Sequence, residues 1–166
     1  MPVVTAYIGL GANIDGPAAH IERAFTELDQ LPATRLVARS HLYKSEPLGP
    51  PGQPDYLNAA AHLETGLSPA DLLAALKELE ARHGRRTGPR WGPRPLDLDI
   101  LLYADVTLAT PELMLPHPGL QERAFVLYPL ADLAPELAVP GLGRVRDLKD
   151  RCRKTRIQRL EDDAND

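Results

Sequence analysis

Two carboxylates stand two residues apart, at Asp97 and Asp99, and an apolar run from Ile100 to Leu102 follows them. On a β-strand, side chains two residues apart point to the same face, so both carboxylates would project together, about 6.6 Å apart at their Cα atoms. A solvated polar stripe is the plain interpretation of such a pair. The functional interpretation is a divalent metal site, because Mg²⁺ binds through one or two carboxylates together with phosphates and water.

An arginine-rich run leads directly into this acidic pair. Between residues 82 and 94 the chain contains no acid and carries Arg82, His83, Arg85, Arg86, Arg90 and Arg94. A planar guanidinium group matches phosphate oxygens bidentately, which a lysine cannot do. A solvated basic loop is the simpler alternative. However, the run would bring phosphate-binding groups beside cation-binding ones, as phosphoryl transfer requires.

Aromatic residues are scarce, and three of the eight stand in or beside irregular segments: Tyr56, Trp91 and Phe125. Tyr56 and Asn58 would share one face of a strand. A ring for stacking and an amide with both donor and acceptor suit a flat, hydrogen-bonding heterocycle. His117 lies between two prolines, and the nearby Arg123 would allow a phosphate contact.

Composition excludes several classes of protein. The chain has 166 residues, with 19 Lys+Arg against 23 Asp+Glu, a net charge of −4 and a single cysteine. One domain is therefore expected, without an internal disulfide or a cysteine zinc site, and bulk nucleic-acid binding is disfavoured. No apolar run is long enough for a membrane helix, and the first residues do not resemble a signal peptide, so we expect a cytoplasmic protein. No Walker motif occurs, and the isolated Gly9-Leu10-Gly11 is interpreted as a turn at the end of a strand.

The order of expected elements is β-α-β-β-α-β. Hydrophobic periodicity, caps and breakers predict strands over 3–10, 35–45, 56–65 and 96–103, helices over 17–31, 69–83 and 125–133, a short strand at 108, and irregular segments over 46–55, 85–95 and 111–122. Asn13 or Asp15 is expected to cap the first helix and Ser68 the second, with Gly84 closing the latter. This order predicts an α+β, ferredoxin-like fold, an antiparallel sheet with helices on one face and extra C-terminal elements.

Together these residues resemble a known family, 6-hydroxymethyl-7,8-dihydropterin pyrophosphokinase of folate biosynthesis. The matching segments extend nearly the whole way to residue 140 and comprise 9–13, 43–49, 53–60, 90–101 and 115–117. The resemblance implies a ferredoxin-like fold and a single pyrophosphokinase domain, placed over 1–148. The segment over 149–166 is mostly charged and is expected to be a tail that frays. ATP would donate its β,γ-pyrophosphate to the pterin's hydroxymethyl oxygen and leave as AMP. The arginine run is one residue shorter than in the family, and Pro118 and Gly119 follow His117.

The resemblance also implies roles for individual residues. Asp97 and Asp99 would hold two Mg²⁺ ions, and Arg85 and Arg94 would act catalytically on the phosphates. The pterin would be bound by Ser45, Leu48, Tyr56, Asn58, Trp91 and Phe125. ATP, the co-substrate, would be bound by Glu80, Arg86, Arg94, Ile100, His117 and Arg123. The expected partners are these two small molecules, with no nucleic acid and no membrane, and the chain is expected to be a monomer.

Two other functions share part of this pattern. Another Mg²⁺-dependent enzyme on the same scaffold, such as a nucleotidyltransferase or phosphatase, would use the acidic pair and the arginines but would not need the ring slot. An RNA-binding ferredoxin-like module would place aromatic residues on an open, basic sheet face. The carboxylates and the net charge of −4 disfavour that second alternative.

Overall fold

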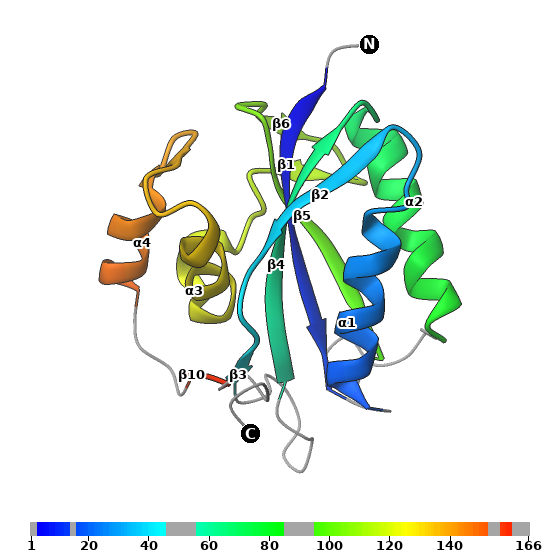
Figure 1. Ribbon diagram of the computed structural model, residues 1–166. Helices are drawn as coiled ribbons and strands as arrows, with labels where there is room; N and C mark the ends of the chain where they lie inside the picture. The colour runs from blue at the N-terminus through cyan, green and yellow to red at the C-terminus, as the bar shows by residue number, and fades with distance from the viewer. Residues whose placement is uncertain (1–2, 14–15, 46–55, 85–94, 153–156, 161–166) are drawn as a thin grey trace.

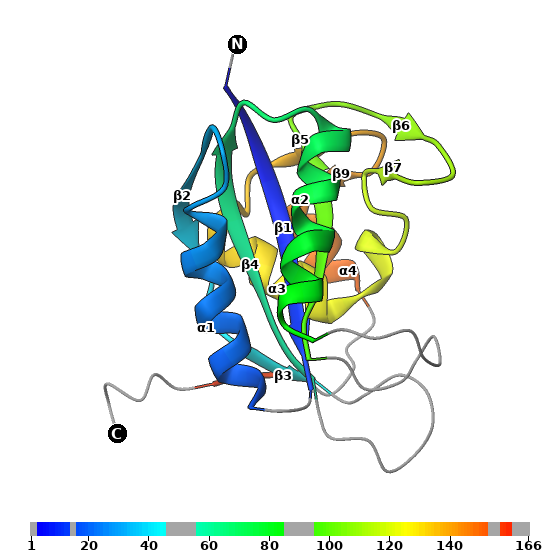
Figure 2. The same ribbon diagram turned by 90° about the vertical axis from the view of Figure 1, so that its right-hand side faces the viewer.

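A central antiparallel sheet with helices on both faces forms the protein (Figures 1 and 2). The computed structural model describes residues 3–13, 16–45, 56–84, 95–152 and 157–160. Its elements are β1 (Val4–Ala12), α1 (Pro17–Leu28), β2 (Thr34–Arg39), β3 (Tyr43–Ser45), β4 (Tyr56–Thr65), α2 (Pro69–Arg82), β5 (Asp97–Tyr103), β6 (Leu108–Ala109), β7 (Met114–Leu115), the 3₁₀ turn η1 (Leu120–Glu122), α3 (Ala124–Leu133), β8 (Ala138–Val139), β9 (Gly143–Arg144), α4 (Val145–Arg151) and β10 (Ile157–Arg159).

The strand order confirms the ferredoxin-like prediction. The sheet runs β10-β3-β4-β1-β5, and β2 pairs with the same edge of β4 as β3 does. All of these pairs are antiparallel. In the order of the four principal strands this is β2-β4-β1-β5, the arrangement of a split β-α-β pair of units.

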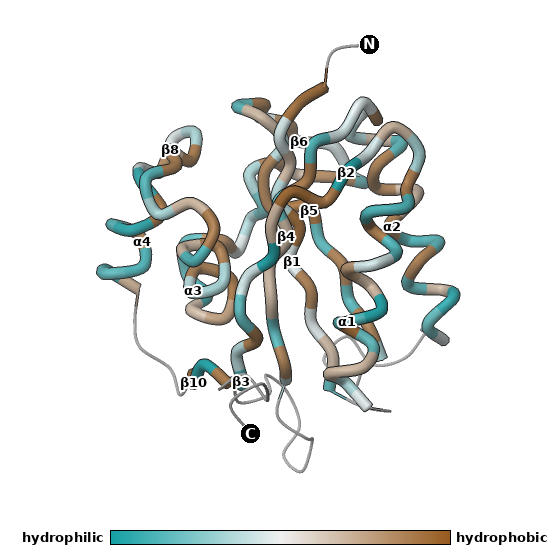
Figure 3. Tube along the Cα trace, viewed as in Figure 1, coloured by the Kyte–Doolittle hydropathy of each residue, from teal (hydrophilic) through white to brown (hydrophobic). Residues whose placement is uncertain are grey.

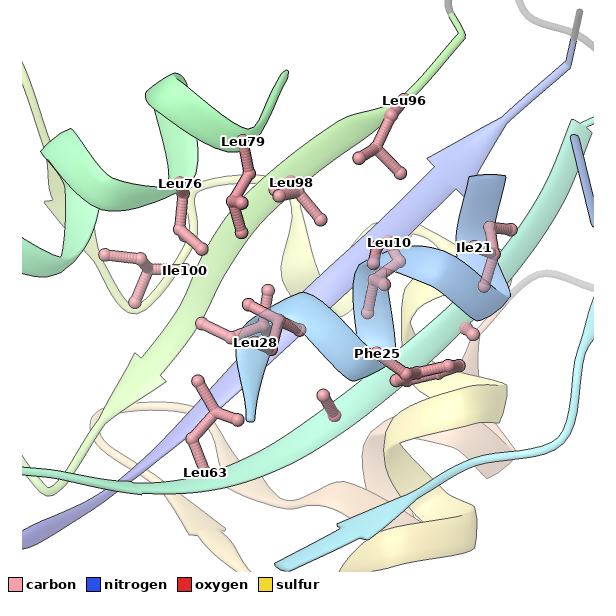
Figure 4. Close-up of a cluster of buried hydrophobic side chains, with 14 of the residues drawn as sticks. Leu10, Ile21, Phe25, Leu28, Leu63, Leu76, Leu79, Leu96, Leu98 and Ile100 are labelled. Carbon is pink, nitrogen blue, oxygen red and sulfur yellow. The ribbon is translucent and has the colours of Figure 1, made fainter. Parts of the chain in front are cut away.

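Two hydrophobic layers lie on the two faces of the sheet. Alternate residues of β1, such as Ile8 and Leu10, pack against α1 and α2, together with Phe25, Leu28 and other buried residues drawn in Figure 4. On the other face, Tyr7 and Leu101 pack against α3 and α4. Strand alternation therefore sends neighbouring side chains of one strand into different cores. In Figure 3 the central strands carry apolar stretches that are interrupted by hydrophilic positions.

Local signals place the first two helices. Ser68 accepts a hydrogen bond from the Asp71 N–H and caps α2 as expected, and Gly84 follows the end of this helix with φ +86°. Only glycine adopts that conformation without strain. The expected cap of α1 is different: Gly16 occupies the N-cap position in a left-handed conformation, without a side-chain hydrogen bond. Pro17 at the first turn is the signal that did mark this helix start.

The expected strand over 35–45 is divided in two, which corrects that prediction. At the break, the Ser40 hydroxyl accepts the Ala60 N–H at 2.8 Å and donates to the carbonyl of His41 at 2.8 Å. Asp132 of α3 accepts the His41 N–H at 3.2 Å and the Tyr43 hydroxyl at 2.8 Å. The Ser40 N–H still donates to the Ala60 carbonyl at 2.9 Å, and these side-chain hydrogen bonds connect the residues at the break to β4 and α3.

The C-terminal elements are more regular than the expected tail. The boundary placed at residue 149 falls inside α4, whose Val145 and Leu148 are buried against α3 and β5. Further on, β10 pairs with β3 through Ile157 and Ser45. The opposite face is thereby covered by elements that follow the ferredoxin-like unit. None of the helices in the described ranges is long and apolar enough to cross a membrane.

A polar row on the α3 side of the sheet gives a prediction for stability against pH. The Glu64 carboxylate accepts the Thr5 hydroxyl at 2.5 Å and lies 3.2 Å from His62 Nε2. The Thr5 hydrogen bond, aided by His62, lowers the pKa of Glu64 although partial burial opposes it. A carboxyl whose folded-state pKa is depressed stabilises the fold above its unfolded pKa and loses that contribution as the pH falls.

We therefore expect Glu64→Gln to flatten the acid limb of the stability curve. Between about pH 7 and about pH 3, the variant should lose less unfolding free energy than the wild type does, measured by urea titration. Glu78→Gln, an exposed substitution on α2, is the control and should follow the wild-type curve. Identical slopes for Glu64→Gln and the wild type would contradict the assignment.

Candidate active site

A cavity lies at the end of the sheet where β1 stops and where β4 and β5 begin, at the lower end of the sheet in Figure 1. Strands β1, β3, β4 and β5 and the start of α3 all contribute to its walls. The lining residues are Gly9, Leu10, Gly11, Ser45, Tyr56, Asn58, Ala59, Asp97, Asp99, Leu101, Arg123, Phe125 and Val126. Five structural elements that are distant in the sequence thus meet at one position.

Strand register explains why the polar residues of the cavity converge. Gly11 pairs with Asn58 on one side and with Asp97 on the other, so these three residues form a row across the sheet. The next row contains Asp99, which pairs with Gly9. Paired residues on antiparallel strands share a face. Asp97, Asp99 and Asn58 therefore project from the α3 side of the sheet, with β1 between the carboxylates and the amide.

The two glycines of β1 form the floor between these groups. A Cβ on Gly11 would lie 3.3 Å from Asn58 Oδ1, and a Cβ on Gly9 would lie 3.2 Å from a methyl group of Leu101. Both contacts are tighter than ordinary packing. The expectation that Gly9-Leu10-Gly11 forms a turn is wrong, because β1 continues through these residues to Ala12. Glycine in a strand interior marks a place that must stay open for a ligand or a close neighbour.

The amide of Asn58 is held in one orientation. Asn58 is buried, and its Nδ2 donates to the Ser45 hydroxyl at 2.8 Å. The first residue of β4, Tyr56, and the second residue of α3, Phe125, also line the cavity and are partly exposed there. The structure therefore brings together four of the six residues expected to bind a flat heterocycle: Ser45, Tyr56, Asn58 and Phe125.

The acidic pair has the setting that a magnesium site with phosphate ligands requires. Asp99 exposes 58% of its side chain, and Asp97 is partly exposed in the same cavity wall. Among the described residues, no group of three or more His, Cys, Asp or Glu side chains could hold a metal by itself. Two carboxylates leave most positions around Mg²⁺ for phosphate oxygens and water, which is its usual arrangement in nucleotide enzymes. The residues present fit a metal that arrives with a polyphosphate.

Positive and neutral donors stand beside the acidic pair. Arg123 lines the cavity, and the Cζ of its guanidinium lies 5.7 Å from the centre of the Phe125 ring. Nε2 of His117 lies 4.0 Å from Asp99 Oδ2. Burial lowers the pKa of His117; Asp99 opposes that shift, and Arg123 adds a smaller lowering. Burial, with the smaller effect of Arg123, favours the neutral imidazole, whereas Asp99 favours the charged form.

Two residues expected at the ATP site, Ile100 and Glu80, are buried beneath it. Ile100 is buried in the core shared with α1 and α2, because strand alternation turns its side chain away from Asp99. Glu80, near the end of α2, is also buried, and its Oε2 accepts the Leu98 N–H at 2.7 Å. Leu98 stands between the two aspartates, so Glu80 anchors the strand segment that carries both.

We expect Glu80→Ala to lower the free energy of unfolding by about 1–3 kcal/mol, because it leaves the buried Leu98 N–H without this acceptor. Glu80→Gln retains an acceptor oxygen and should recover most of the loss. Glu78→Ala, on the exposed side of the same helix and paired with Arg82 at 2.7 Å, is the matched control. Chemical denaturation checks the prediction, and equal stability of Glu80→Ala and Glu78→Ala would contradict it.

Five expected site residues lie outside the described residues: Leu48, Arg85, Arg86, Trp91 and Arg94. Conversely, the cavity contains residues that sequence reasoning did not assign to it, above all Gly9 and Gly11. The sequence signal for these two glycines is their spacing of two, which places both on one face of a strand. The structure pairs them with Asp99 and Asp97. Leu101 and Val126 also line the cavity, but their sequence pattern is that of ordinary core residues.

The chain is similar to known proteins over most of its length. Residues 7–135 match the family described as 7,8-dihydro-6-hydroxymethylpterin-pyrophosphokinase (HPPK). A Pseudomonas aeruginosa protein named 2-amino-4-hydroxy-6-hydroxymethyldihydropteridine pyrophosphokinase is 49% identical over 154 residues, covering 93% of this chain and 95% of that protein. A protein of the same name from Haemophilus influenzae is 44% identical over 146 residues, covering 88% of this chain and 91% of that one.

Solved structures support the fold. A Plasmodium falciparum HPPK-DHPS variant crystallised with SDX-DHP superposes with a TM-score of 0.73 at 15% identity. A second HPPK-DHPS structure, in complex with substrates, gives a TM-score of 0.71 at 12% identity. Each comparison covers 90% of this chain, which spans somewhat less than half of those longer proteins (45% and 43%). By its sequence match and its fold, the chain belongs to the 7,8-dihydro-6-hydroxymethylpterin-pyrophosphokinase family.

Proposed function

We propose that the cavity between β1, β4, β5 and α3 is the place where this pyrophosphokinase transfers pyrophosphate from ATP to the hydroxymethyl group of 6-hydroxymethyl-7,8-dihydropterin. The observation that carries the assignment is the row across the sheet, with Asn58 and the two carboxylates on one face and glycines between them. An enzyme that acts on a nucleotide alone would need the two carboxylates but not the amide. The buried Asn58 amide, with aromatic rings beside it, is the feature that suits a pterin.

The pterin occupies the half of the cavity nearer β3 and β4. Asn58 offers an amide oxygen and one amide hydrogen beyond the one that bonds Ser45. Tyr56 and Phe125 supply ring faces from two different elements, which suits stacking of a flat bicyclic ring between them. By family resemblance, Leu48 and Trp91 complete this half.

ATP occupies the half nearer β5 and the start of α3. Asp97 and Asp99 hold Mg²⁺ there, and two ions are expected from the resemblance. When bound, Mg²⁺ neutralises charge on the triphosphate and orients it for in-line displacement. Arg123 and His117 offer hydrogen-bond donors beside the carboxylates. Arg85, Arg86 and Arg94 add phosphate contacts by resemblance, whereas Glu80 and Ile100 support the strand.

The reaction forms one bond and breaks one. The hydroxymethyl oxygen bonds to the β-phosphorus of ATP, the bond from that phosphorus to the α,β-bridging oxygen breaks, and AMP leaves with that oxygen. The hydroxyl proton is released. Positioning of the hydroxyl in line with the leaving group, together with donors around the phosphates, supplies most of the rate enhancement in such transfers.

The experiment is incubation of the purified chain with Mg-ATP and 6-hydroxymethyl-7,8-dihydropterin, with products separated by ion-exchange chromatography. AMP and the pterin diphosphate should appear in equal amounts. ADP would indicate transfer of a single phosphoryl group, and inorganic pyrophosphate would indicate nucleotidyl transfer, so either product in place of AMP would overturn the proposal. Omission of Mg²⁺, with EDTA present, should stop the reaction.

A monomeric state and a cytoplasmic location belong to this proposal. Both proposed substrates are small molecules. Sedimentation equilibrium should give the mass of one chain, about 18.2 kDa. A dimer mass would contradict the monomer without affecting the assignment of the site.

A further inference from the structure

Gly119 lies directly before η1, two residues after His117 and four before Arg123. Its backbone angles are φ −102° and ψ 8°, which other residues also adopt, so the conformation does not require glycine. The space around it does. A Cβ at Gly119 would lie 2.6 Å from Nε, 2.8 Å from Cζ and 3.2 Å from Cδ of Arg123.

The end of the Arg123 side chain therefore occupies the space that a Cβ at position 119 would need. Arg123 lines the cavity together with Asp97, Asp99 and Phe125, and its guanidinium Cζ lies 5.7 Å from the centre of the Phe125 ring. All three overlapping atoms belong to the last part of the arginine side chain. An added methyl group would be relieved by moving the guanidinium itself, and the backbone would have no reason to shift.

Gly119 also fixes the orientation of His117. Its main-chain N–H donates to Nδ1 of that ring at 3.2 Å. An Nδ1 that accepts a hydrogen bond leaves the proton of a neutral imidazole on Nε2, the atom 4.0 Å from Asp99 Oδ2. The donor of His117 is thus aimed at the acidic side of the cavity.

We propose that Gly119 is a positioning residue for pyrophosphate transfer. Because Gly119 has no side chain, the Arg123 guanidinium can lie against it, and the Gly119 N–H orients the His117 ring toward the triphosphate side of the cavity. This role rests on the proposed function of the cavity. It acts through two residues and does not require Gly119 to touch a substrate.

A double-mutant cycle tests the contact between Gly119 and Arg123. Gly119→Ala, Arg123→Ala and the double variant are compared with the wild type for kcat/KM of Mg-ATP at saturating pterin. Loss of a charge-assisted contact predicts that each single variant falls roughly tenfold to a hundredfold. The double variant should be no worse than Arg123→Ala within about twofold, because the two substitutions remove the same interaction.

Fold controls keep the result interpretable. Thermal melts of Gly119→Ala should match or exceed the wild-type Tm, since the backbone angles accept alanine. Gly66→Ala, where the Cβ would meet Ala33 Cβ at 3.4 Å, is the matched glycine control and should keep wild-type kinetics. Long-range ¹H–¹⁵N NMR of the imidazole should report the proton of His117 on Nε2 in the wild type.

Three results would overturn the proposal: wild-type kinetics in Gly119→Ala, additive losses in the double variant, or wild-type kinetics in Arg123→Ala. None of these would affect production of AMP by the wild type. A wild-type chain that makes no AMP would instead remove the function itself, so the two failures are distinguishable.

Discussion

Replacing Asp97 or Asp99 with Asn should reduce turnover by at least about a thousandfold, equivalent to about 4 kcal/mol in the activation barrier. Each substitution keeps the size of the side chain but removes one of the two negative carboxylates proposed to hold Mg²⁺ beside the triphosphate. Among the described residues that line the cavity, these two carboxylates are the acidic groups, so the remaining one would have to hold the cation with phosphate and water. Initial rates of AMP release at saturating substrates provide the measurement.

Asp105→Asn is the matched control for this loss. Asp105 is exposed just beyond the opposite end of β5, so the same chemical change is made far from the cavity. Its rate should stay within about twofold of the wild type, because exposed substitutions of this kind have small effects. The Mg²⁺ concentration needed for half-maximal rate should rise in Asp97→Asn. A near-normal rate in that variant would overturn the metal assignment.

Replacing Asn58 with Leu should weaken pterin binding by at least about a hundredfold and leave Mg-ATP binding nearly unchanged. Leu has a similar size but cannot hydrogen-bond, so the polar edge of the ring would be buried against an apolar side chain. The Ser45 hydroxyl would also lose the Nδ2 donor that it accepts at 2.8 Å. Isothermal titration with pterin, and separately with a non-hydrolysable ATP analogue, measures both affinities.

Ser45→Ala separates the two functions of the Asn58 amide. This substitution retains every atom of Asn58 but removes the hydroxyl that orients it, so the pterin affinity should fall less, by roughly threefold to tenfold. Equal losses in Ser45→Ala and Asn58→Leu would mean that the amide acts only as support for β3. Unchanged pterin affinity in Asn58→Leu would place the pterin elsewhere.

The two faces of strand β5 have different functions in the site. Leu98 and Ile100 fill the core against α1 and α2, while Asp97 and Asp99 face the cavity on the other side. The anchor from Glu80 to the Leu98 N–H holds the strand between the carboxylates. Movement of this strand by one residue would bury both carboxylates and expose both apolar side chains. The core on one face thus sets the position of the charges on the other.

Sequence alone determined the elements whose signals are local. The strand predicted over 56–65, the cap at Ser68 and the proline at position 17 each depend on a few neighbouring residues, and the structure confirms each. The cavity lining includes the acidic pair, Tyr56 and Asn58, and the spacing of two within each pair predicts from sequence that its members share a face.

Only the tertiary structure decided which strands lie side by side and what stands between the chemical groups. Pairing of β1 with both β4 and β5 makes Gly9 and Gly11 the floor of the cavity, although in the sequence they are a weak pattern. The break at Ser40 and the contact between Gly119 and Arg123 likewise depend on partners that sequence patterns do not show. Local propensity is set by neighbouring residues, whereas register and close approach are set by packing between distant segments, and the site is built from the second kind of contact.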